Sequence, residues 1–294
     1  MSIPHPVASV VVPGARSMVF AALALMLAGF VSVEALFAPR AELWERWTAH
    51  DPLATAEIDH TAWTDFLATY VSDGNDGVTR VAYAQVTNAD TGALGTYLAQ
   101  LAATPISRFN RAEQRAYWIN LYNALTVKVV LDHYPVASIR DIDISPGLFA
   151  DGPWGKELIE VEGEALSLNN IEHRILRPIW RDSRIHYTVN CAAIGCPNLP
   201  SVAFTAGNAE MLLEAAARAY VNHPRGSRIE DGKLVVSSIY VWFQEDFGDN
   251  DAGVIAHLKR YADRDLAAKL AAVERIGAHE YDWSLNDAND GPSS

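Results

Sequence analysis

The stretch NRAEQRAYWINLYNALTVKVVLDHYP, Asn110–Pro135, carries the strongest helical pattern of the chain. Its apolar residues recur at three- and four-residue spacing, which places them on one face of a helix. They include Trp118, Leu121, Leu125 and Val129. Asn110 and Glu113 match a capping box, and Pro135 cannot continue a helix. The stretch therefore predicts a long helix that lies at the centre of the core.

Patterns on either side predict further helices and a few strands. Helical spacing recurs in TAWTDFLATYV (61–71), NNIEHRILRPIW (169–180, stopped by Pro178), NAEMLLEAAARAYVNHP (208–224) and AGVIAHLKRYA (252–262). Strand patterns occur in KELIEVEGEALSL (156–168), RIHYTVN (184–190) and SRIEDGKLVVSS (227–238, with Asp231-Gly232 as its turn), and AHEYDWSLND (278–287) reads as extended. No linker rich in serine or glycine splits residues 41–287. We therefore expect a helix-rich single domain of the α+β class with a small antiparallel sheet.

The composition is that of an ordinary globular protein. The 294 residues are 50% hydrophobic and 20% charged, which is enough for a substantial core. The formal net charge is −13, and the 23 lysines and arginines do not cluster. An acidic chain without a basic patch argues against anionic partners, so we expect no nucleic-acid partner.

The N-terminal run SMVFAALALMLAGFVSV, Ser17–Val33, is an uncharged segment of 17 residues that follows Arg16. It is slightly long for the core of a signal peptide and slightly short for a membrane span. We predict that residues 1–38 are a secretory signal or a membrane anchor, with membrane contact only through residues 17–33 if they are retained. The domain would then cover residues 39–287 in an extracytoplasmic location, periplasmic or secreted, and residues 288–294 would be a disordered tail.

Both cysteines lie in HYTVNCAAIGCPNLPS, His186–Ser201, with four residues between Cys191 and Cys196. The spacing is not C-x-x-C, and no second cysteine pair or His-x₃₋₅-His follows, so neither a thioredoxin motif nor a zinc site is indicated. We expect no metal and no cofactor. A disulfide is compatible with an oxidising compartment, but through so short a loop it would add only about 2 kcal/mol.

A nucleophilic cysteine is the remaining alternative. Cys191 is expected where a strand ends and a tight turn begins, which is a common place for a reactive group. A thiol needs a lowered pKa or a nearby base. His173, beside Glu172 on a short helix, is one candidate base. His186 is another, but five residues along a regular strand would put it on the opposite face from Cys191.

Two asparagines on the predicted central helix need an explanation. Asn120 and Asn123 are three residues apart, so they lie on one face. Asparagine is a poor residue for a helix interior. Each either clamps a neighbouring loop or orients a catalytic group. Asp246 and Asp282 lie in aromatic-rich segments and are most simply surface polar residues.

Five segments, in this order, resemble the domain of unknown function 547 family. They are YWINLYNALTV (117–127), LNNIEHRIL (168–176), VNCAAIGCPNL (189–199), SSIYVWFQEDFG (237–248) and YDWSLN (281–286). The opening LWERWTAHDP (43–52) is similar to secreted bacterial members. The family pattern marks Asn120, Asn123, Glu172, His173, Cys191, Cys196 and Pro197. Some members look to be fused to glutaredoxin-like or coiled-coil modules, which hints at thiol chemistry by association.

Three functions stay open from the sequence. The first is a thiol enzyme for acyl transfer or peptide hydrolysis, with Cys191 as nucleophile, His173 as base and Asn120 or Glu172 as orienter. A Cys, a His and an Asn are the parts of a papain-like or transglutaminase-like enzyme, although their chain order here is unusual. The second is a non-catalytic binding domain with a Cys191–Cys196 disulfide, and the third is a thiol–disulfide redox protein. A protein or peptide is the expected partner.

Overall fold

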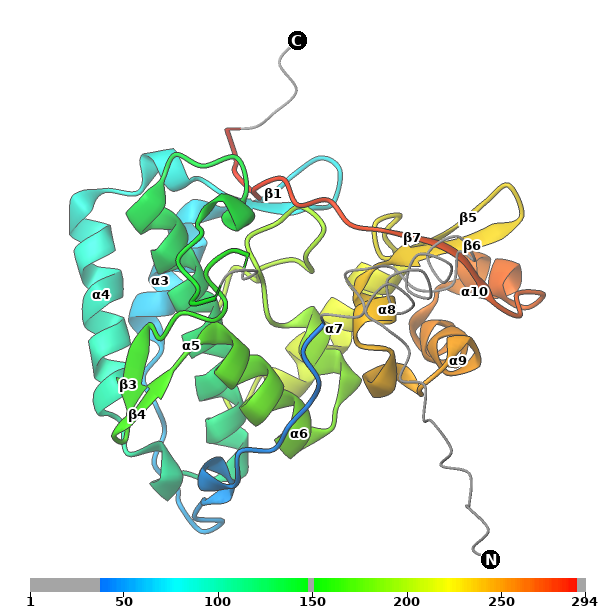
Figure 1. Ribbon diagram of the computed structural model, residues 1–294. Coiled ribbons are helices and arrows are strands. Elements are labelled where there is room, and N and C mark those ends of the chain that lie inside the picture. Colours follow the sequence, from blue (N-terminus) through cyan, green and yellow to red (C-terminus); the bar gives the residue numbers. More distant parts are fainter. Residues whose placement is uncertain (1–37, 148–150, 290–294) are drawn as a thin grey trace, which may run out of the picture. The chain divides into compact units, whose positions relative to one another are not determined.

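The computed structural model describes residues 38–147 and 151–289 (Figure 1). The predicted signal or anchor falls outside the described residues except for Ala38, and the predicted tail does so except for its first two residues. Within Pro39–Ser294, the described residues form one compact unit. None of the helices in the described ranges is long and apolar enough to cross a membrane.

Helix α5, Arg111–His133, is the centre of the fold, as predicted. Sixteen of its 23 residues are buried, and they lie on every face of the helix. The side chain of Asn110 caps it by accepting from the backbone N–H groups of Ala112 and Glu113. The predicted capping box is only half right, because the Glu113 carboxylate accepts from the backbone N–H of Ile58 at 3.2 Å. The helix is therefore capped at its start and tied to the segment that precedes it.

The other helices pack in two groups around two hydrophobic clusters. They are α3 Thr61–Tyr70, α4 Asn88–Ala103, α6 Arg177–Trp180, α7 Ala209–Asn222, α8 Ile239–Trp242, α9 Asp251–Tyr261 and α10 Arg264–Leu270. In the larger cluster, helix α4 packs against α5, and α3 packs against α4. The smaller cluster gathers the buried tyrosines of the C-terminal half with α7 and α9. The predicted helices at 61–71, 208–224 and 252–262 are confirmed.

Three small sheets complete the helix-rich α+β fold. The antiparallel pairs are β1 Val71–Asp73 with β2 Thr79–Val81, and β3 Ile159–Val161 with β4 Glu164–Leu166. The third sheet holds β5 Ser227–Glu230, β6 Lys233–Ser237 and β7 Ile276–Glu280. Strands β5 and β6 form the predicted hairpin, whose turn residues Asp231 and Gly232 both have positive φ. The expectation of a single antiparallel sheet is wrong, because β7 pairs with β6 in parallel.

The segment before the cysteines is not the predicted strand. Residues Ser183–Tyr187 form a 3₁₀ helix whose start is capped by the Asp182 side chain. The hydroxyl of Thr188 then donates to the carbonyl of Ile185 at 2.8 Å. Such local side-chain bonds compete with strand formation, which the alternation of apolar residues does not reveal. The argument that His186 and Cys191 lie on opposite faces of a strand therefore fails.

The short helix before this segment also differs from the prediction. Residues Asn170–Leu176 form a π-helix that continues into α6. Pro178 does not stop the helix, because the carbonyls of His173 and Arg174, one turn before it, accept from the backbone N–H groups of Glu42 and Trp44 at 2.9 and 3.0 Å instead. The chain leaves α6 at Arg181, which adopts a left-handed conformation. A π-helix is rare and often occurs at functional sites.

The C-terminal extended segment, residues 276–287, joins distant parts of the molecule. It starts as β7, then Leu285 forms an antiparallel bridge with Ala193, and Asp287 forms a parallel bridge with Val81. Figure 1 shows this segment in red, running from the third sheet to β1 and β2. The cysteine loop is thereby placed between α5 on one side and the end of the chain on the other.

Candidate functional site

The chain that enters the cysteine loop is fixed to α5 by Asn123. Its side-chain N–H donates to the carbonyl of Thr188 at 2.8 Å, and its Oδ1 accepts from the backbone N–H of Asn190 at 2.8 Å. Both backbone groups belong to buried residues, and buried N–H and C=O groups need a hydrogen-bond partner. The central helix therefore sets the position at which the loop begins.

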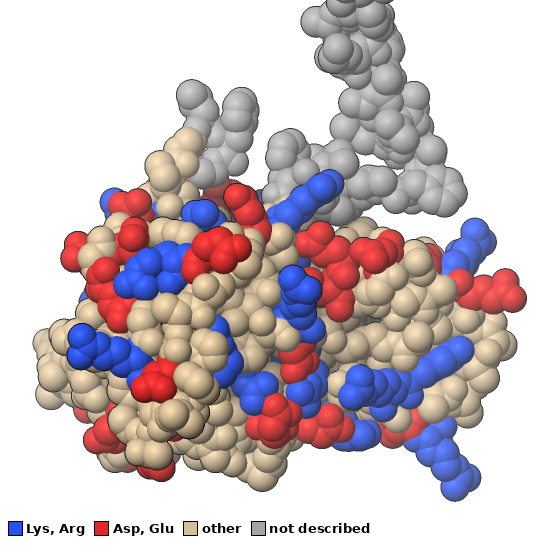
Figure 2. Space-filling view, turned by 90° about the horizontal axis from the view of Figure 1, so that it is seen from below, with Lys and Arg blue, Asp and Glu red and all other residues tan. Residues whose placement is uncertain are grey.

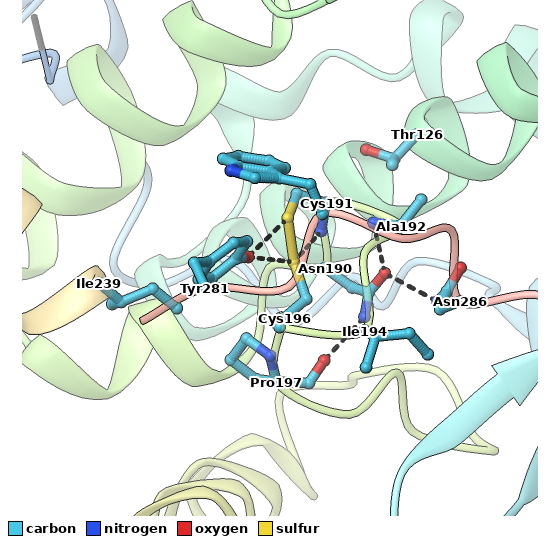
Figure 3. The surroundings of a disulfide bond; sticks show 12 residues. Thr126, Asn190, Cys191, Ala192, Ile194, Cys196, Pro197, Ile239, Tyr281 and Asn286 are labelled. Atoms are coloured by element: carbon cyan, nitrogen blue, oxygen red, sulfur yellow. Dashed lines mark hydrogen bonds between the residues drawn. A yellow bond between two sulfur atoms is a disulfide. The ribbon is translucent and has the colours of Figure 1, made fainter. Parts of the chain in front are cut away.

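Asn190 holds the loop together from inside. Its Nδ2 donates to the carbonyl of Pro197 at 2.7 Å, and its Oδ1 accepts from the backbone N–H of Ala192 at 2.8 Å. Asn286, from the C-terminal extended segment, also approaches Oδ1 at 3.4 Å. Figure 3 shows this side chain between the two ends of the loop. Asparagine often bonds nearby backbone in tight loops, and that signal at the position before Cys191 could have revealed this role.

Cys191 and Cys196 form a disulfide, with their Cα atoms 6.1 Å apart. The two halves differ in access, because Cys191 is partly exposed whereas Cys196 is only 2% exposed. The backbone N–H of Cys191 donates to the sulfur of Cys196 at 2.8 Å. A donor in this position would favour a negative charge on that sulfur after reduction.

Tyr281 is a member of the site that the sequence did not single out. Its hydroxyl lies 3.0 Å from the Cys191 sulfur and 3.1 Å from the Cys196 sulfur (Figure 3). Its ring contacts both Trp242 and Trp283, with centroid distances of 4.8 and 4.6 Å. Burial, together with neighbouring Tyr220, raises the pKa of Tyr281 well above its usual value, so the phenol keeps its proton. Tyr281 is the first residue of the segment YDWSLN, whose aromatic residues were interpreted from the sequence as packing residues.

The π-helix contributes a buried polar cluster that contains Glu172 and His173. The Glu172 carboxylate lies 3.9 Å from His173 Nδ1 and 3.7 Å from His186 Nδ1. His186 Nε2 lies 2.7 Å from an Asp246 carboxylate oxygen. Although burial opposes the shift, the bond with His186 and the charge of Arg177 lower the pKa of Asp246 to about 2. Asp246 is thus an anchor of this cluster and more than a surface residue.

His173 has no free lone pair to act as a base. Its Nδ1 lies 3.0 Å from Nη1 of Arg177, and a guanidinium only donates, so Nδ1 accepts. Burial, opposed by the charge of Glu172, lowers the pKa of His173 to about 4, so the ring is neutral with its proton on Nε2. Among the described residues, no hydrogen bond joins His173 to either sulfur. The structure thus places Glu172 and His173 together but does not pair His173 with Cys191.

Asn120 is occupied in the same way as Asn123. Its Nδ2 donates to the carbonyl of Phe204 at 2.7 Å, and its Oδ1 accepts from the backbone N–H of Phe204 at 3.0 Å. Both asparagines therefore clamp loops to α5. The remaining candidate, Asp282, accepts from the backbone N–H of Gly195 through its own carbonyl at 2.8 Å. Within the described ranges, no three His, Cys, Asp or Glu side chains are grouped to hold a metal ion.

Residues 106–221 match the model of a family described as "Protein of unknown function, DUF547". The matched residues include α5, the π-helix, the cysteine loop and all of α7 except its last residue. They do not include Tyr281, which reaches the site from the C-terminal extended segment. No curated protein and no solved structure matches the chain.

Proposed function

We propose that the protein, whose DUF547 domain carries the disulfide, is a thiol–disulfide exchange protein that acts on another protein through Cys191 and Cys196. The observation that carries this proposal is the difference in exposure between the two cysteine residues, because Cys191 is partly exposed and Cys196 is buried. An accessible sulfur that is attacked, and a buried one that leaves and returns, is the arrangement that exchange needs.

The reaction balances without a further cofactor. A thiolate of a partner dithiol attacks the Cys191 sulfur, the Cys191–Cys196 bond breaks, and Cys196 leaves as a thiolate. The second partner thiolate then attacks the partner sulfur of the mixed disulfide and releases Cys191. Two electrons pass from the partner to the pair, and the two thiol protons of the partner end on Cys191 and Cys196. The reverse sequence reduces a partner disulfide.

Thiol-dependent acyl transfer has less support. It would require Cys191 as a free thiolate with an adjacent base. His173 accepts from Arg177, and Asn120 is bonded at both ends of its amide to Phe204. Neither side chain is available for the role that the sequence suggested. A papain-like or transglutaminase-like fold stays a prediction that no comparison supports.

A non-catalytic binding domain is the second candidate, and one observation favours it. The loop is largely buried and is bonded to α5, to itself and to the end of the chain. In a binding domain, the role of the disulfide would be to stabilise this loop. In both functions an oxidising, extracytoplasmic location is expected.

The face shown in Figure 2 bears on the partner. Basic side chains lie beside acidic ones there, without a wide basic area. Among the described residues, ion pairs such as Arg46 with Glu162 at 2.7 Å and Arg115 with Glu210 at 2.5 Å place a carboxylate against a cation. This face therefore lacks the wide basic area that nucleic acid would require, and we propose a protein or peptide as the partner.

The test uses the full chain with one sulfur removed at a time. After reduction, Cys196→Ser should form a stable mixed disulfide when mixed with glutathione disulfide, because the resolving sulfur is missing. Cys191→Ser should form little, because Cys196 is buried. Mass spectrometry measures the adduct on each variant, and a glutathione series gives the reduction potential of the wild type. Equal, slow reaction of both variants, with a potential below about −300 mV, would reject exchange and leave the structural disulfide of a binding domain.

A further inference from the structure

The hydroxyl of Tyr281 touches both sulfurs although 85 residues separate it from Cys196. In the oxidised pair the sulfurs carry no proton, so the hydroxyl is the donor. The pair is therefore bonded by two donors, the backbone N–H of Cys191 and the phenol of Tyr281. Both lie within the cysteine loop or directly against it.

Gly195 makes this contact attainable. The backbone N–H of Gly195 donates to the carbonyl of Asp282 at 2.8 Å, and that of Ile194 donates to the carbonyl of Ser284 at 2.8 Å. A Cβ atom on Gly195 would lie 2.9 Å from two backbone atoms of Asp282 and 3.0 Å from the ring of Tyr281. Such contacts are too close for real Cβ atoms, and backbone cannot move aside as a flexible side chain can. Glycine at 195 thus permits the close approach that brings Tyr281 to the sulfurs.

The ring of Tyr281 is also fixed from the other side. Trp242 and Trp283 stack on one another with centroids 5.7 Å apart, and each contacts the Tyr281 ring. A side chain held on several sides offers its hydroxyl in one position. The geometry is that of a preorganised donor, which needs no rearrangement when charge develops on sulfur.

We infer that Tyr281 is a catalytic residue of the proposed exchange reaction, in which its hydroxyl donates a hydrogen bond to the sulfur that leaves as a thiolate. Gly195 is a positioning residue that acts through Tyr281. This inference rests on the proposed function. When Cys196 leaves, the bond between the sulfurs breaks, the electron pair stays on Cys196, and the phenol O–H stabilises that charge without giving up its proton. When Cys191 is released from the mixed disulfide, the same hydroxyl serves that sulfur.

The test compares Tyr281→Phe with Tyr240→Phe in the full chain. Tyr240 is buried in the second cluster, and its hydroxyl bonds Tyr187 and neither cysteine. The first measurement is the pH dependence of iodoacetamide alkylation of the reduced protein. A hydrogen bond to a charged group corresponds to a pH midpoint lower by about 1 to 2. Tyr281→Phe should therefore raise the midpoint by about that amount, and Tyr240→Phe should leave it unchanged.

The second measurement is the rate at which dithiothreitol reduces the oxidised protein at neutral pH. Tyr281→Phe should slow this rate about tenfold or more, and Gly195→Ala should resemble it, while the Tyr240→Phe control keeps the wild-type rate. An unchanged midpoint and an unchanged rate in Tyr281→Phe would overturn the inference. Because the proposed function is tested separately by the adduct on Cys196→Ser, a normal adduct with an inert Tyr281 would reject this role alone.

Discussion

The asparagine pair on α5 provides a matched experiment, because Asn120 and Asn123 make equivalent bonds to different loops. Each side chain is fully buried, and each forms one donor and one acceptor bond with backbone. Substitution by alanine leaves one buried carbonyl and one buried N–H unsatisfied. At about 1 to 3 kcal/mol for each group, and with a small gain in helix propensity, we expect each variant to lose about 3 kcal/mol of unfolding free energy.

The two variants should differ in the chemistry of the disulfide. Asn123 holds the start of the cysteine loop, whereas Asn120 holds Phe204, which lies beyond it. If about 1.4 kcal/mol of the loss in Asn123→Ala appears as easier local opening of the loop, reduction by dithiothreitol should become about tenfold faster. Asn120→Ala should lose similar stability but keep the wild-type reduction rate.

Urea unfolding with the disulfide intact measures the first effect, and thiol release over time measures the second. The reasoning is refuted if the two variants are reduced at the same rate, because the clamp of Asn123 would then not control the loop. It is also refuted if either variant loses less than about 1 kcal/mol, because the amide would then not be satisfying buried backbone groups.

Three further outcomes follow from other parts of the structure. In urea unfolding, Gly226→Ala should lower the unfolding free energy by about 3 kcal/mol or more, because its Cβ would lie 1.9 Å from a backbone oxygen. Gly92→Ala, with open space around its Cβ, should be neutral or stabilising in the same assay. Burial lowers the pKa of His60, His173 and His257 from 6.5 to about 4. The unfolded chain therefore binds these protons first, so stability is full above pH 6.5 and falls between pH 6.5 and 4, by at most about 3 kcal/mol for each histidine; a flat urea midpoint across that window would contradict this. Reductant should lower the unfolding free energy by about 2 kcal/mol, which is the loop-closure value for so short a disulfide loop. An unchanged unfolding free energy would show that the unfolded chain gains no conformational entropy when the disulfide is reduced.

The sequence predicted the elements whose signals are local. Helix α5 was found because its apolar spacing, its Asn110 cap and the following Pro135 all agree. The Asp231-Gly232 turn was found because few residue pairs accept two positive φ angles. The segment 184–190 misled because apolar alternation predicts a strand, while caps by Asp182 and Thr188 favour a 3₁₀ helix. Apolar periodicity reveals the alternation but does not reveal the side-chain hydrogen bonds that favour the 3₁₀ helix.

The site was predicted in part for the same reason. Cys191 and Cys196 were recognisable because cysteine is rare and the two are close in sequence. The clamping role of Asn123 was one of two alternatives, because a buried asparagine needs hydrogen-bond partners but the sequence of the helix does not identify them. Tyr281 was missed because its contact with sulfur depends on how the end of the chain folds back. The alternative of Asn120 or His173 as a catalytic partner could not be judged until their bonds to Phe204 and Arg177 were known.

The C-terminal extended segment has a consequence for how the protein is made. The two cysteines are five positions apart, whereas the bond between Tyr83 and Asn286 spans 203 positions. Closing the longer loop costs about 3 kcal/mol more in chain entropy, and it must wait until the ribosome has delivered the last residues. The two cysteines are therefore synthesised before Tyr281, and the pair has no phenol beside it until the C-terminal extended segment has folded back. A chain that stops before residue 276 keeps both sulfurs but never acquires the environment in which we propose that they work.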